Sequence, residues 1–484
     1  MPGSPGSSLA DSEDRVTSVR IIGAGLAGCE AAWQVVRRGV PVTLYEMRPA
    51  RQTDVHQSGN FAELVCSNSL RADKTENAVG LLKEEMRRLD SLVLRAADAT
   101  RVPAGAALAV DRERFSAEIT RELQSHPLVT VRREEITGIP DADGAGSPVV
   151  IASGPLTAPA LSEAVRAFVG QEYLHFYDAI SPIVLAESID RTLVFRASRW
   201  DRSLRGADAG PSDSAASGVD AGVASDPAAT PAVEDEGDYL NCPMNKDEYR
   251  AFYDALTRAE SATVHDFDRE QFFEGCLPVE VLAHRGPDTL RFGPMKPVGL
   301  RDPRTGRTPY AVVQLRQDNL AADHFSLVGF QTQLKWAEQT RVLRMIPGLG
   351  RAEFVRLGMV HRNTYLNGPA VLCETWQTRS RPDLFFAGQI SGVEGYVESA
   401  ASGLLAGRNA AALALGETPS APPRTTAIGA LAYYVSHAAS AGYQPSNITF
   451  GIMEPLELPG RSKGDRKAAL AARALADLAR WMGV

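Results

Sequence analysis

Three glycines near the start of the chain have the spacing of a dinucleotide-binding turn. Gly23, Gly25 and Gly28 form G-x-G-x-x-G between a β-branched run and a stretch with helical periodicity. The first permits a tight turn, the second lets the backbone approach a pyrophosphate, and the third permits close helix–strand packing. Glu46 ends the next apolar run, where a carboxylate can bind a ribose. The pattern predicts a dinucleotide site formed by Gly23, Ala24, Gly25, Leu26, Ala27, Gly28 and Glu46.

A second glycine-rich segment, residues 384–403, repeats the order of strand, turn and helix. It contains Gly388, Gly392 and Gly395, and we expect its helix to begin near residues 398–399. A helix N-terminus opposite the first would suit the electron-rich pyrimidine end of a reduced flavin, because N–H groups and the helix dipole favour negative charge. We therefore interpret the dinucleotide as FAD. The alternative is that these glycines only allow tight helix packing.

The five cysteines are irregularly spaced and form no C-x-x-C pair, which argues against a zinc ribbon and against a flavin disulfide reductase. No metal site is predicted. Cys66 lies in AELVCSNSLR near Arg71, a cation able to lower the pKa of a thiol. Cys276 lies in FFEGCLPVE, where a turn can present the side chain. The others have no comparable claim, and a buried inert thiol is the usual state: Cys29, Cys242 and Cys373.

Positive charge gathers in residues 284–316, although the whole chain has a net charge of −8. Seven lysines and arginines face two aspartates there, a local charge of +5. Phosphate contacts supply most non-specific RNA affinity, and Phe292 and Tyr310 are available for a flipped base. A solvated charged face is the alternative. The candidate RNA-binding residues are Arg285, Arg291, Arg301, Arg304 and Arg307.

The predicted elements that position these residues indicate an α/β fold. A strand at 19–22, a helix to residue 38 and a strand at 42–45 form a βαβ unit. Because the glycine segments at 23–28 and 384–403 build one site, the centre of the chain is an insertion. The predicted fold is a Rossmann-like FAD-binding domain of the glutathione-reductase type, interrupted by a smaller α+β insertion domain. Further helices are expected at 78–89, 248–256 and 461–482, and strands at 149–154, 311–315 and 384–387.

Domain boundaries follow from composition. We predict a disordered tail at 1–17, an FAD-binding domain at 18–185 and 331–484, and an insertion domain at 186–330. Within the insertion, 30 of the 33 residues at 206–238 are Ala, Gly, Ser, Pro, Thr, Asp or Glu, and none is basic or aromatic. Such a segment cannot offset its ordering entropy, so we predict a disordered acidic loop. The polar start and the lack of a long apolar run indicate a cytoplasmic protein with no membrane association.

Longer blocks of the sequence resemble one family. They include IIGAGLAGCEAAW, FAELVCSNSLRAD, FFEGCLPVEVLAHRG and LFFAGQISGVEGYVESAASGLLAG. These blocks are similar to the TrmFO family of folate- and FAD-dependent tRNA (uracil-5-)-methyltransferases, and they cover most of the chain from residue 19 to about 407. The last block is shared with the related GidA (MnmG) family, whereas the cysteine-bearing blocks are more specific to TrmFO. The chain departs from the family pattern in its N-terminal tail and at 206–238.

The resemblance implies a reaction and its participants. C5 of the T-loop uridine, tRNA position 54, would be methylated with 5,10-methylenetetrahydrofolate as carbon donor and reduced FAD as reductant. NADH or NADPH would re-reduce the flavin, and without a second G-x-G-x-x-G the nicotinamide would visit only transiently. The resemblance also implies Cys276 as the nucleophile at uracil C6 and Cys66 as the flavin-side partner, with the reverse assignment left open. The tRNA T-arm and the folate are the expected partners, with no obligate protein partner.

Three other hypotheses about the function compete with this one. A GidA-like wobble-uridine enzyme has a long helical C-terminal region, whereas only about 80 residues follow the ESAASG block here. A generic small-molecule FAD oxidoreductase would need neither two isolated cysteines nor a basic stretch. A non-catalytic FAD-binding tRNA chaperone would bind RNA without single-turnover methyl transfer.

Overall fold

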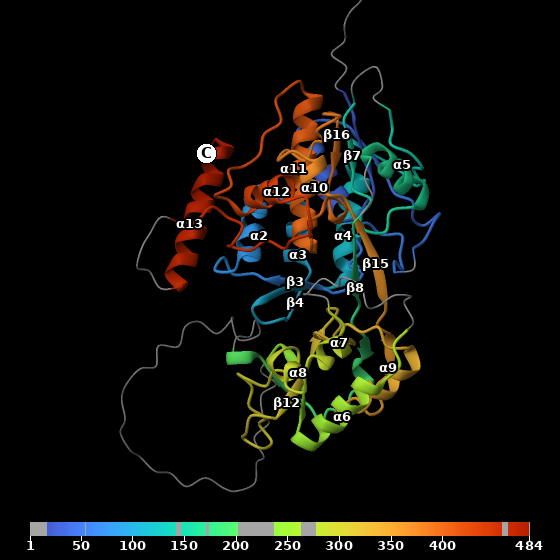
Figure 1. The fold of residues 1–484 in the computed structure, drawn as a ribbon, viewed down its shortest axis with the longest axis vertical. Coiled ribbons are helices and arrows are strands. Elements are labelled where there is room, and N and C mark those ends of the chain that lie inside the picture. Colours follow the sequence, from blue (N-terminus) through green and yellow to red (C-terminus); the bar gives the residue numbers. More distant parts are fainter. Residues whose placement is uncertain are drawn as a thin grey trace, which may run out of the picture.

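The computed structural model describes residues 17–53, 55–141, 147–170, 174–201, 237–262, 277–456 and 463–483. These residues form two units joined by a two-stranded ribbon (Figure 1). The larger unit combines both ends of the described chain, and the smaller contains its middle. The 1–16 part of the predicted tail, residues 206–236 of the predicted acidic loop, and Cys276 lie outside the described residues. No helix in the described ranges is long and apolar enough to cross a membrane.

The larger unit is built on a parallel sheet with strand order β16-β7-β1-β2-β6. Its central strand is buried on both faces, as expected for a β-branched run in a parallel sheet. A small antiparallel sheet, β3-β5-β4, lies beside it. The strands are β1 (Val19–Ile22), β2 (Val42–Tyr45), β3 (Ser69–Ala72), β4 (Arg101–Val102), β5 (Ala107–Val110), β6 (Val129–Arg132), β7 (Val149–Ile151) and β16 (Leu384–Phe386).

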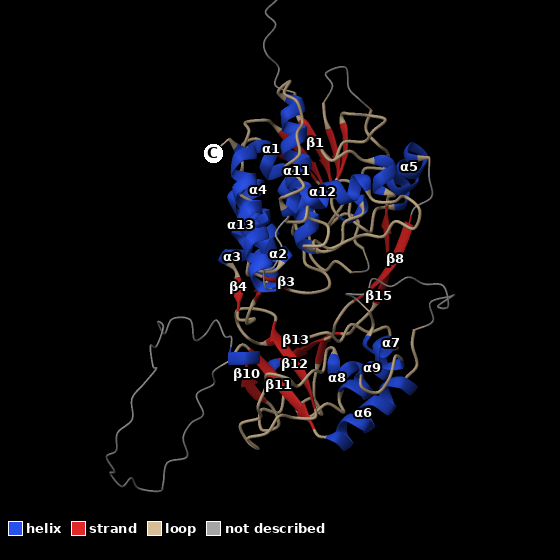
Figure 2. Ribbon diagram, turned by 60° about the vertical axis from the view of Figure 1, so that its left-hand side comes forward, coloured by secondary structure: helices blue, strands red, loops and turns tan. Residues whose placement is uncertain are grey.

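Helices cover the larger sheet (Figure 2). They are α1 (Leu26–Val36), α2 (Ala78–Arg88), α3 (Leu92–Ala99), α4 (Arg112–Ser125), α5 (Pro159–Val169), α10 (Gly368–Val371), η5 (Gln389–Ser391), α11 (Tyr396–Ala414), α12 (Ala427–His437) and α13 (Lys463–Met482). Small residues let α11 approach α1 closely, although the two lie far apart in the chain. A Cβ on Gly403 would lie 2.1 Å from the Ala27 carbonyl oxygen, and one on Gly407 would lie 2.4 Å from that of Ala31. The two glycines therefore fix α11 against α1.

The smaller unit is a six-stranded antiparallel sheet with helices on one side (Figure 2). Its strand order is β10-β11-β12-β13-β9-β14. The elements are β9 (Ile183–Leu185), η1 (Ala186–Ser188), β10 (Phe195–Ala197), η2 (Arg199–Asp201), β11 (Tyr239–Met244), α6 (Lys246–Arg258), α7 (Val279–His284), α8 (Thr289–Phe292), β12 (Ala311–Gln317), β13 (His324–Leu327), α9 (Trp336–Leu343) and β14 (Phe354–Arg356). The connecting ribbon is β8 (Leu174–Ala179) paired with β15 (Val360–Tyr365).

The smaller unit has its own core, which extends further along the chain than composition indicated. Buried apolar residues from Val184 to Ala352 form one cluster, and β14 completes the sheet by pairing with β9. The predicted boundary at residue 330 therefore cuts through this core, because the helix α9 and the strand β14 follow it. We propose that the insertion domain spans about residues 183–356, and that the FAD-binding domain takes the segments on either side.

Candidate active site

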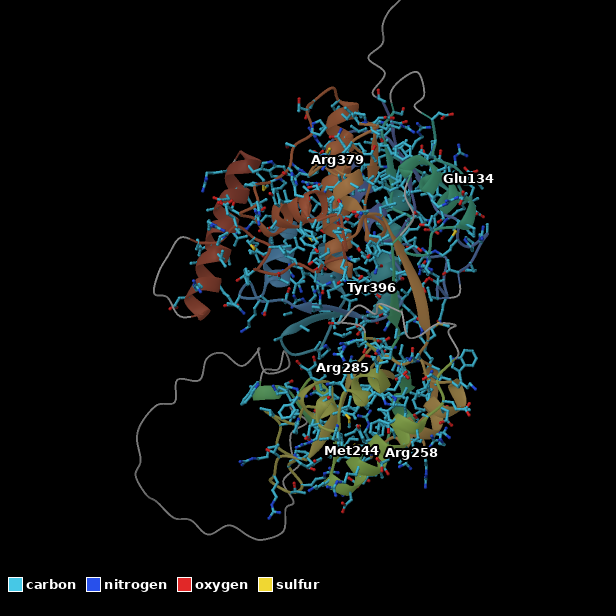
Figure 3. The ribbon with its side chains drawn as sticks, in the orientation of Figure 1. Glu134, Met244, Arg258, Arg285, Arg379 and Tyr396 are labelled. Carbon is cyan, nitrogen blue, oxygen red and sulfur yellow. The ribbon has the colours of Figure 1, made fainter. Side chains whose placement is uncertain are left out.

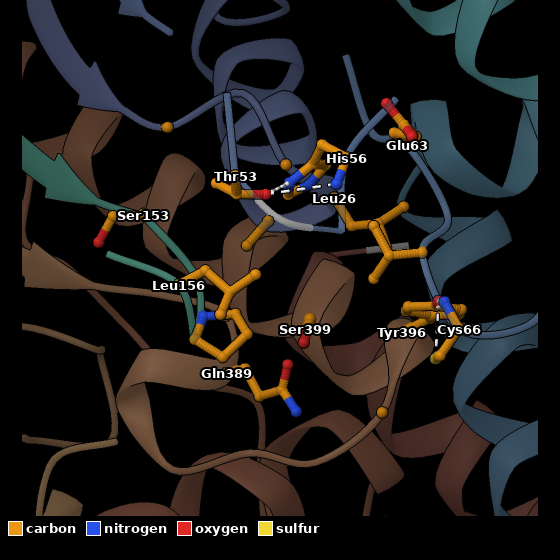
Figure 4. A pocket seen from close by; sticks show the side chains of 18 of the residues that line it. Leu26, Thr53, His56, Glu63, Cys66, Ser153, Leu156, Gln389, Tyr396 and Ser399 are labelled. Atoms are coloured by element: carbon orange, nitrogen blue, oxygen red, sulfur yellow. Dashed lines mark hydrogen bonds between the residues drawn. The ribbon is translucent and has the colours of Figure 1, made fainter. Parts of the chain in front are cut away.

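One cavity of about 480 Å³ brings the two glycine-rich segments together. Gly25 and Leu26 line it from the start of α1, and Gly388 and Gly395 line it from the turns before α11. Arg316 and residues 326–329 of the smaller unit close part of its wall. Figure 4 shows side chains from both glycine-rich regions, among them Leu26 and Gln389, around the cavity. The site is therefore shared between the two units.

The first glycine-rich turn forms a cradle that fits a pyrophosphate. Gly23 has φ +100°, and a Cβ there would lie 2.5 Å from the Ala152 carbonyl oxygen. A Cβ on Gly28 would lie 1.7 Å from the Gly23 oxygen, whereas one on Gly25 would meet no atom within 4 Å. Gly25 is the N-cap of α1 and offers no side chain to the first-turn N–H groups. These groups remain free for an anion, so the residues fit a dinucleotide phosphate.

Glu46 lies beside the same turn and lines the cavity. Its Oε2 accepts from the Ala24 N–H at 3.0 Å, and its Oε1 accepts from the backbone N–H and the Nε of Arg48, each at 3.0 Å. Burial by itself raises the pKa of Glu46, but the bonds from Arg48 and Ala24 outweigh burial and lower it. The carboxylate is therefore ionised and acceptor-only, as recognition of ribose hydroxyls requires.

The second helix N-terminus lies beside the first and points the same way, which corrects the expectation that the two would be opposed. Ala27 faces Gly403 and Ala31 faces Gly407, so α1 and α11 run parallel. From that register, the start of α11 protrudes about 9 Å beyond the start of α1, at 1.5 Å per residue. Two staggered positive helix ends therefore face one cavity. An elongated ligand with a phosphate at one position and an electron-rich ring at the other matches this spacing.

The predicted dinucleotide residues divide into two groups. Those that line the cavity are Gly23, Gly25, Leu26, Ala27, Glu46, Gly388 and Gly395. The remaining three are not among its lining residues: Ala24, Gly28 and Gly392. They shape it indirectly, since Ala24 donates to Glu46 and a Cβ on Gly392 would lie 2.5 Å from the Tyr443 hydroxyl.

Cys66 lines the cavity next to the start of α11. Its Sγ lies 2.9 Å from the hydroxyl of Tyr396, the first residue of that helix (Figure 4). The same hydroxyl accepts the backbone N–H of Cys66 at 2.8 Å and that of Ser67 at 3.3 Å. Burial raises the pKa of Tyr396 well above its usual value, so the phenol keeps its proton. Tyr396 therefore fixes both the backbone and the side chain of the Cys66 loop.

Arg71 lines the same cavity and has an acidic partner of its own. Its backbone is left-handed at φ +62°, within the irregular register of β3. Its guanidinium binds the buried carboxylate of Glu398 and, at 2.8 Å, the Oδ1 of Asn447. The charge of Arg71 is therefore paired with that of Glu398.

Three other arginines interact electrostatically with the Cys66 sulfur: Arg112, Arg316 and Arg356. Arg112 also pairs with Asp318 at 2.9 Å. Arg316 donates to Ser67 Oγ at 2.9 Å and to Asn68 Oδ1 at 2.8 Å, and so holds the residues after Cys66. Positive charge beside a thiol favours its thiolate form, which is the nucleophile.

These residues were missed because they come from four elements, α4, β12, β14 and α11. One signal was available, since Tyr396 lies in the YVESAASG block that carries the family resemblance. Arg316 was counted within the basic stretch but not assigned to a site. Its 9% exposure places it in the cavity wall instead of on the surface.

The predicted RNA-binding arginines lie on the smaller unit and differ in their partners. Arg291 stacks on Tyr310, with its Cζ 3.7 Å from the ring centroid, and pairs with Asp288. Arg304 pairs with Asp302 at 2.8 Å. The remaining three, Arg285, Arg301 and Arg307, have exposed side chains. Arg285 lies on the part of the smaller unit that faces Tyr396 of the larger unit (Figure 3).

Two of the three cysteines interpreted as inert are buried in the structure. Cys29 and Cys242 are fully buried, and burial raises the pKa of both, that of Cys242 to about 12. Cys373 is only partly buried. No group of His, Cys, Asp and Glu suited to a metal ion occurs among the described residues.

Comparison with known proteins places the chain in a family. The model of the glucose inhibited division protein A family matches residues 18–208 and 208–418. A protein from Heliobacterium modesticaldum is 56% identical over 96% of this chain and 98% of its own length. One from Symbiobacterium thermophilum is 57% identical over 96% of both chains. Both are named methylenetetrahydrofolate–tRNA-(uracil-5-)-methyltransferase TrmFO.

Solved structures agree with this fold. Aquifex aeolicus GidA, in two crystal forms, superposes with TM-scores of 0.65 and 0.64 over 98% and 96% of this chain, and 74% and 76% of the GidA chain. The identities of 16% and 18% show a shared FAD-binding flavoprotein fold alone. They are far below the identity to the TrmFO proteins, so the GidA-like alternative is not favoured. The chain therefore belongs to the TrmFO family of tRNA (uracil-5-)-methyltransferases.

Proposed function

We propose that this protein methylates C5 of the T-loop uridine at tRNA position 54, with 5,10-methylenetetrahydrofolate as carbon donor and FAD as its flavin. The observation that carries the proposal is the position of Cys66. It lines the same cavity as the glycine cradle of α1, and a proton donor, Tyr396, lies against its sulfur. A thiol beside a dinucleotide site suits a flavin-dependent one-carbon transfer, in which a thiolate can activate a carbon centre next to the flavin.

The chemistry sets what the residues must do. The methylene carbon leaves the folate and bonds to uracil C5, the C5 proton departs, and two electrons reduce the new group to a methyl. Reduced FAD, when bound, supplies those two electrons. Uracil C5 is a weak nucleophile until a thiolate adds at C6, and removal of the C5 proton later breaks the C6–S bond and releases that thiolate. The protein must therefore provide a thiolate and a group that removes the C5 proton.

Each described residue has a task in this scheme. The cradle of Gly23 and Gly25 with Glu46 binds the dinucleotide. Cys66 serves the carbon-transfer half of the reaction, held by Tyr396. Arg316, with Arg112 and Arg356, keeps positive charge at Cys66, which favours the thiolate.

The role of Cys276 rests on the sequence, because it lies outside the described residues. We propose it as the nucleophile at uracil C6. Transfer RNA carrying 5-fluorouridine at the target tests this assignment, because fluorine cannot leave as a proton does and the adduct is trapped. Cys276→Ala should abolish a denaturation-resistant protein–RNA complex, whereas Cys66→Ala should leave it. Loss of the complex only in Cys66→Ala would reverse the assignment, and its persistence in both variants would exclude both thiols.

NADH or NADPH would re-reduce the flavin by a transient visit, and the protein would work in the cytoplasm on free tRNA. The direct test of function is the T-loop nucleoside of tRNA from a strain that lacks the gene. Uridine should replace 5-methyluridine, and the wild-type gene should restore the methyl group, whereas Cys66→Ala should not. Unchanged 5-methyluridine in the deletion strain would contradict the proposal, and altered wobble uridines would favour the GidA-like alternative.

A further inference from the structure

Trp200 has a backbone and an exposure that stability does not explain. It is left-handed, with φ +61° and ψ +30°, which is costly for a bulky residue, and its side chain is 63% exposed. The surroundings hold it there. Its N–H donates to the Gly299 oxygen at 3.1 Å, and Arg199 donates to Val298 O at 2.9 Å and to Gln314 Oε1 at 3.0 Å. A strained conformation that exposes an apolar ring points to function.

One face of the indole is covered and the other is open. A Cβ built on Gly299 would lie 2.8 Å from Cε2 and 3.0 Å from Cδ2 of Trp200, so the ring lies against this glycine. Gly299 also has φ +81°, a conformation that disfavours any larger residue. With one face against the backbone, an exposure of 63% requires the opposite face to be accessible to solvent. The result is a rigid aromatic surface on a fixed seat.

The position of this ring connects the basic stretch with the active-site cavity. Gly299 lies between the exposed side chains of Lys296 and Arg301. Gln314, which Arg199 contacts, accepts the N–H of Val328 at 2.9 Å, and Val328 lines the cavity. Gly299, the seat of the ring, is therefore flanked in sequence by two cations, and Arg199, the residue before Trp200, is linked to the cavity wall through Gln314.

We propose that Trp200 is a stacking platform for an unpaired nucleobase of the RNA substrate, outside the cavity in which the target uracil reacts. This inference rests on the proposed tRNA substrate. A loop that gives up one base to an enzyme leaves neighbouring bases without stacking partners, and an open indole replaces them. The exposed Lys296 and Arg301, on either side of the glycine that seats the ring, can contact phosphates next to such a base. Stacking of one base on an aromatic side chain changes affinity about tenfold and tolerates any base.

Trp336 provides a matched control, because it is 64% exposed on α9 of the same unit. Affinity for unmodified tRNA is measured by fluorescence anisotropy with the FAD-loaded protein at several salt concentrations. Trp200→Ala should raise the Kd about tenfold with an unchanged salt slope, because stacking releases no counterions. Trp200→Phe should retain most of the affinity, and Trp336→Ala should retain all of it. Gly299→Ala should weaken binding by pushing the ring from its seat.

A stability measurement separates this role from a structural one. Trp200→Gly removes the strain of the left-handed backbone and should raise the Tm while it weakens tRNA binding. Equal affinity of wild type and Trp200→Ala for tRNA would contradict the stacking role and leave the proposed function intact. A loss of affinity in Trp336→Ala as large as that in Trp200→Ala would do the same. A lowered Tm in Trp200→Gly would make Trp200 a structural residue. If the wild-type protein bound no tRNA, the proposed function itself would fail.

Discussion

The Tyr396 hydroxyl and the Cys66 sulfur lie 2.9 Å apart, although 330 residues separate them in the chain. The phenol oxygen accepts two backbone N–H groups, those of Cys66 and Ser67, so its single proton is directed at the sulfur. This contact joins the N-terminus of α11, and hence the flavin side of the cavity, to the thiol proposed for carbon transfer. The thiol proposed for carbon transfer is thus held by the same helix that shapes the proposed cofactor site.

Tyr396→Phe should shift the pH dependence of Cys66 alkylation. The variant loses the hydrogen bond to the thiolate, and a bond to a charged group is worth about 1.5–3 kcal/mol, so the midpoint of the iodoacetamide rate should rise by about one to two pH units. The rate is measured on the FAD-loaded protein, with Cys66→Ala giving the background from other thiols. A midpoint that does not move would show that Tyr396 only packs against the loop.

Gly25→Val and Gly28→Val should fail in different ways. A Cβ at Gly25 meets no protein atom, so the fold should survive while the side chain takes the place of the pyrophosphate and FAD is lost. A Cβ at Gly28 would lie 1.7 Å from the Gly23 oxygen, so folding itself should be impaired by several kcal/mol. Flavin absorbance per protein and thermal unfolding of the apoprotein measure the two effects. Stoichiometric FAD in the Gly25→Val protein would show that the dinucleotide site lies elsewhere.

His56 should make stability depend on acid pH. Burial and then the positive charge of Arg48 lower its pKa to about 4, against about 6.5 in the unfolded chain. Between these values the unfolded state binds more protons, so the stability is fully present above pH 6.5 and is lost as pH falls towards 4. His56→Gln has no such proton, and its Tm should fall less over this range. Parallel Tm curves for the two proteins would contradict a half-buried His56 that stays neutral in the folded protein.

The exposed arginines of the basic stretch should contribute unequally to tRNA binding. Arg301, Arg304 and Arg307 are all exposed, but Arg304 is held by Asp302 and donates to the Thr192 carbonyl at 2.9 Å. The double variant Arg301→Gln/Arg307→Gln should weaken binding across tRNA species and reduce the salt slope by about two. Arg304→Gln should mainly lower the Tm. An unchanged salt dependence of tRNA binding in the double variant would indicate that the stretch is only a solvated charged face.

The local elements were predictable because their signals lie within a few residues. β1 and β2 are found at their predicted residues, and α1 ends two residues before the predicted end, since a β-branched run and an apolar period of 3.6 specify them directly. The glycine cradle was predictable for the same reason, because each glycine has a steric task within six residues of the others. The second helix was expected near residue 398 and begins at Tyr396.

The surroundings of Cys66 could not be predicted, because they depend on packing between distant elements. Arg71 is only five residues away, yet a left-handed backbone and a shifted strand register direct it to Glu398. Arg316 reaches the cavity only because the insertion domain packs against the larger unit. Composition likewise gives no boundary before α9 and β14, and we propose that both belong to the insertion because they pack on its core.

Single-turnover transfer of labelled carbon tests the proposed methyltransferase most directly. Pre-reduced, FAD-loaded protein is mixed with isotopically labelled 5,10-methylenetetrahydrofolate and an unmodified tRNA transcript, and the T-loop nucleosides are analysed by mass spectrometry. The wild-type protein should yield 5-methyluridine that carries the labelled carbon, and Cys66→Ala should yield none while still binding FAD and tRNA. No labelled 5-methyluridine from the wild-type protein, or equal labelling by Cys66→Ala, would contradict a folate-dependent methyl transfer that requires this thiol.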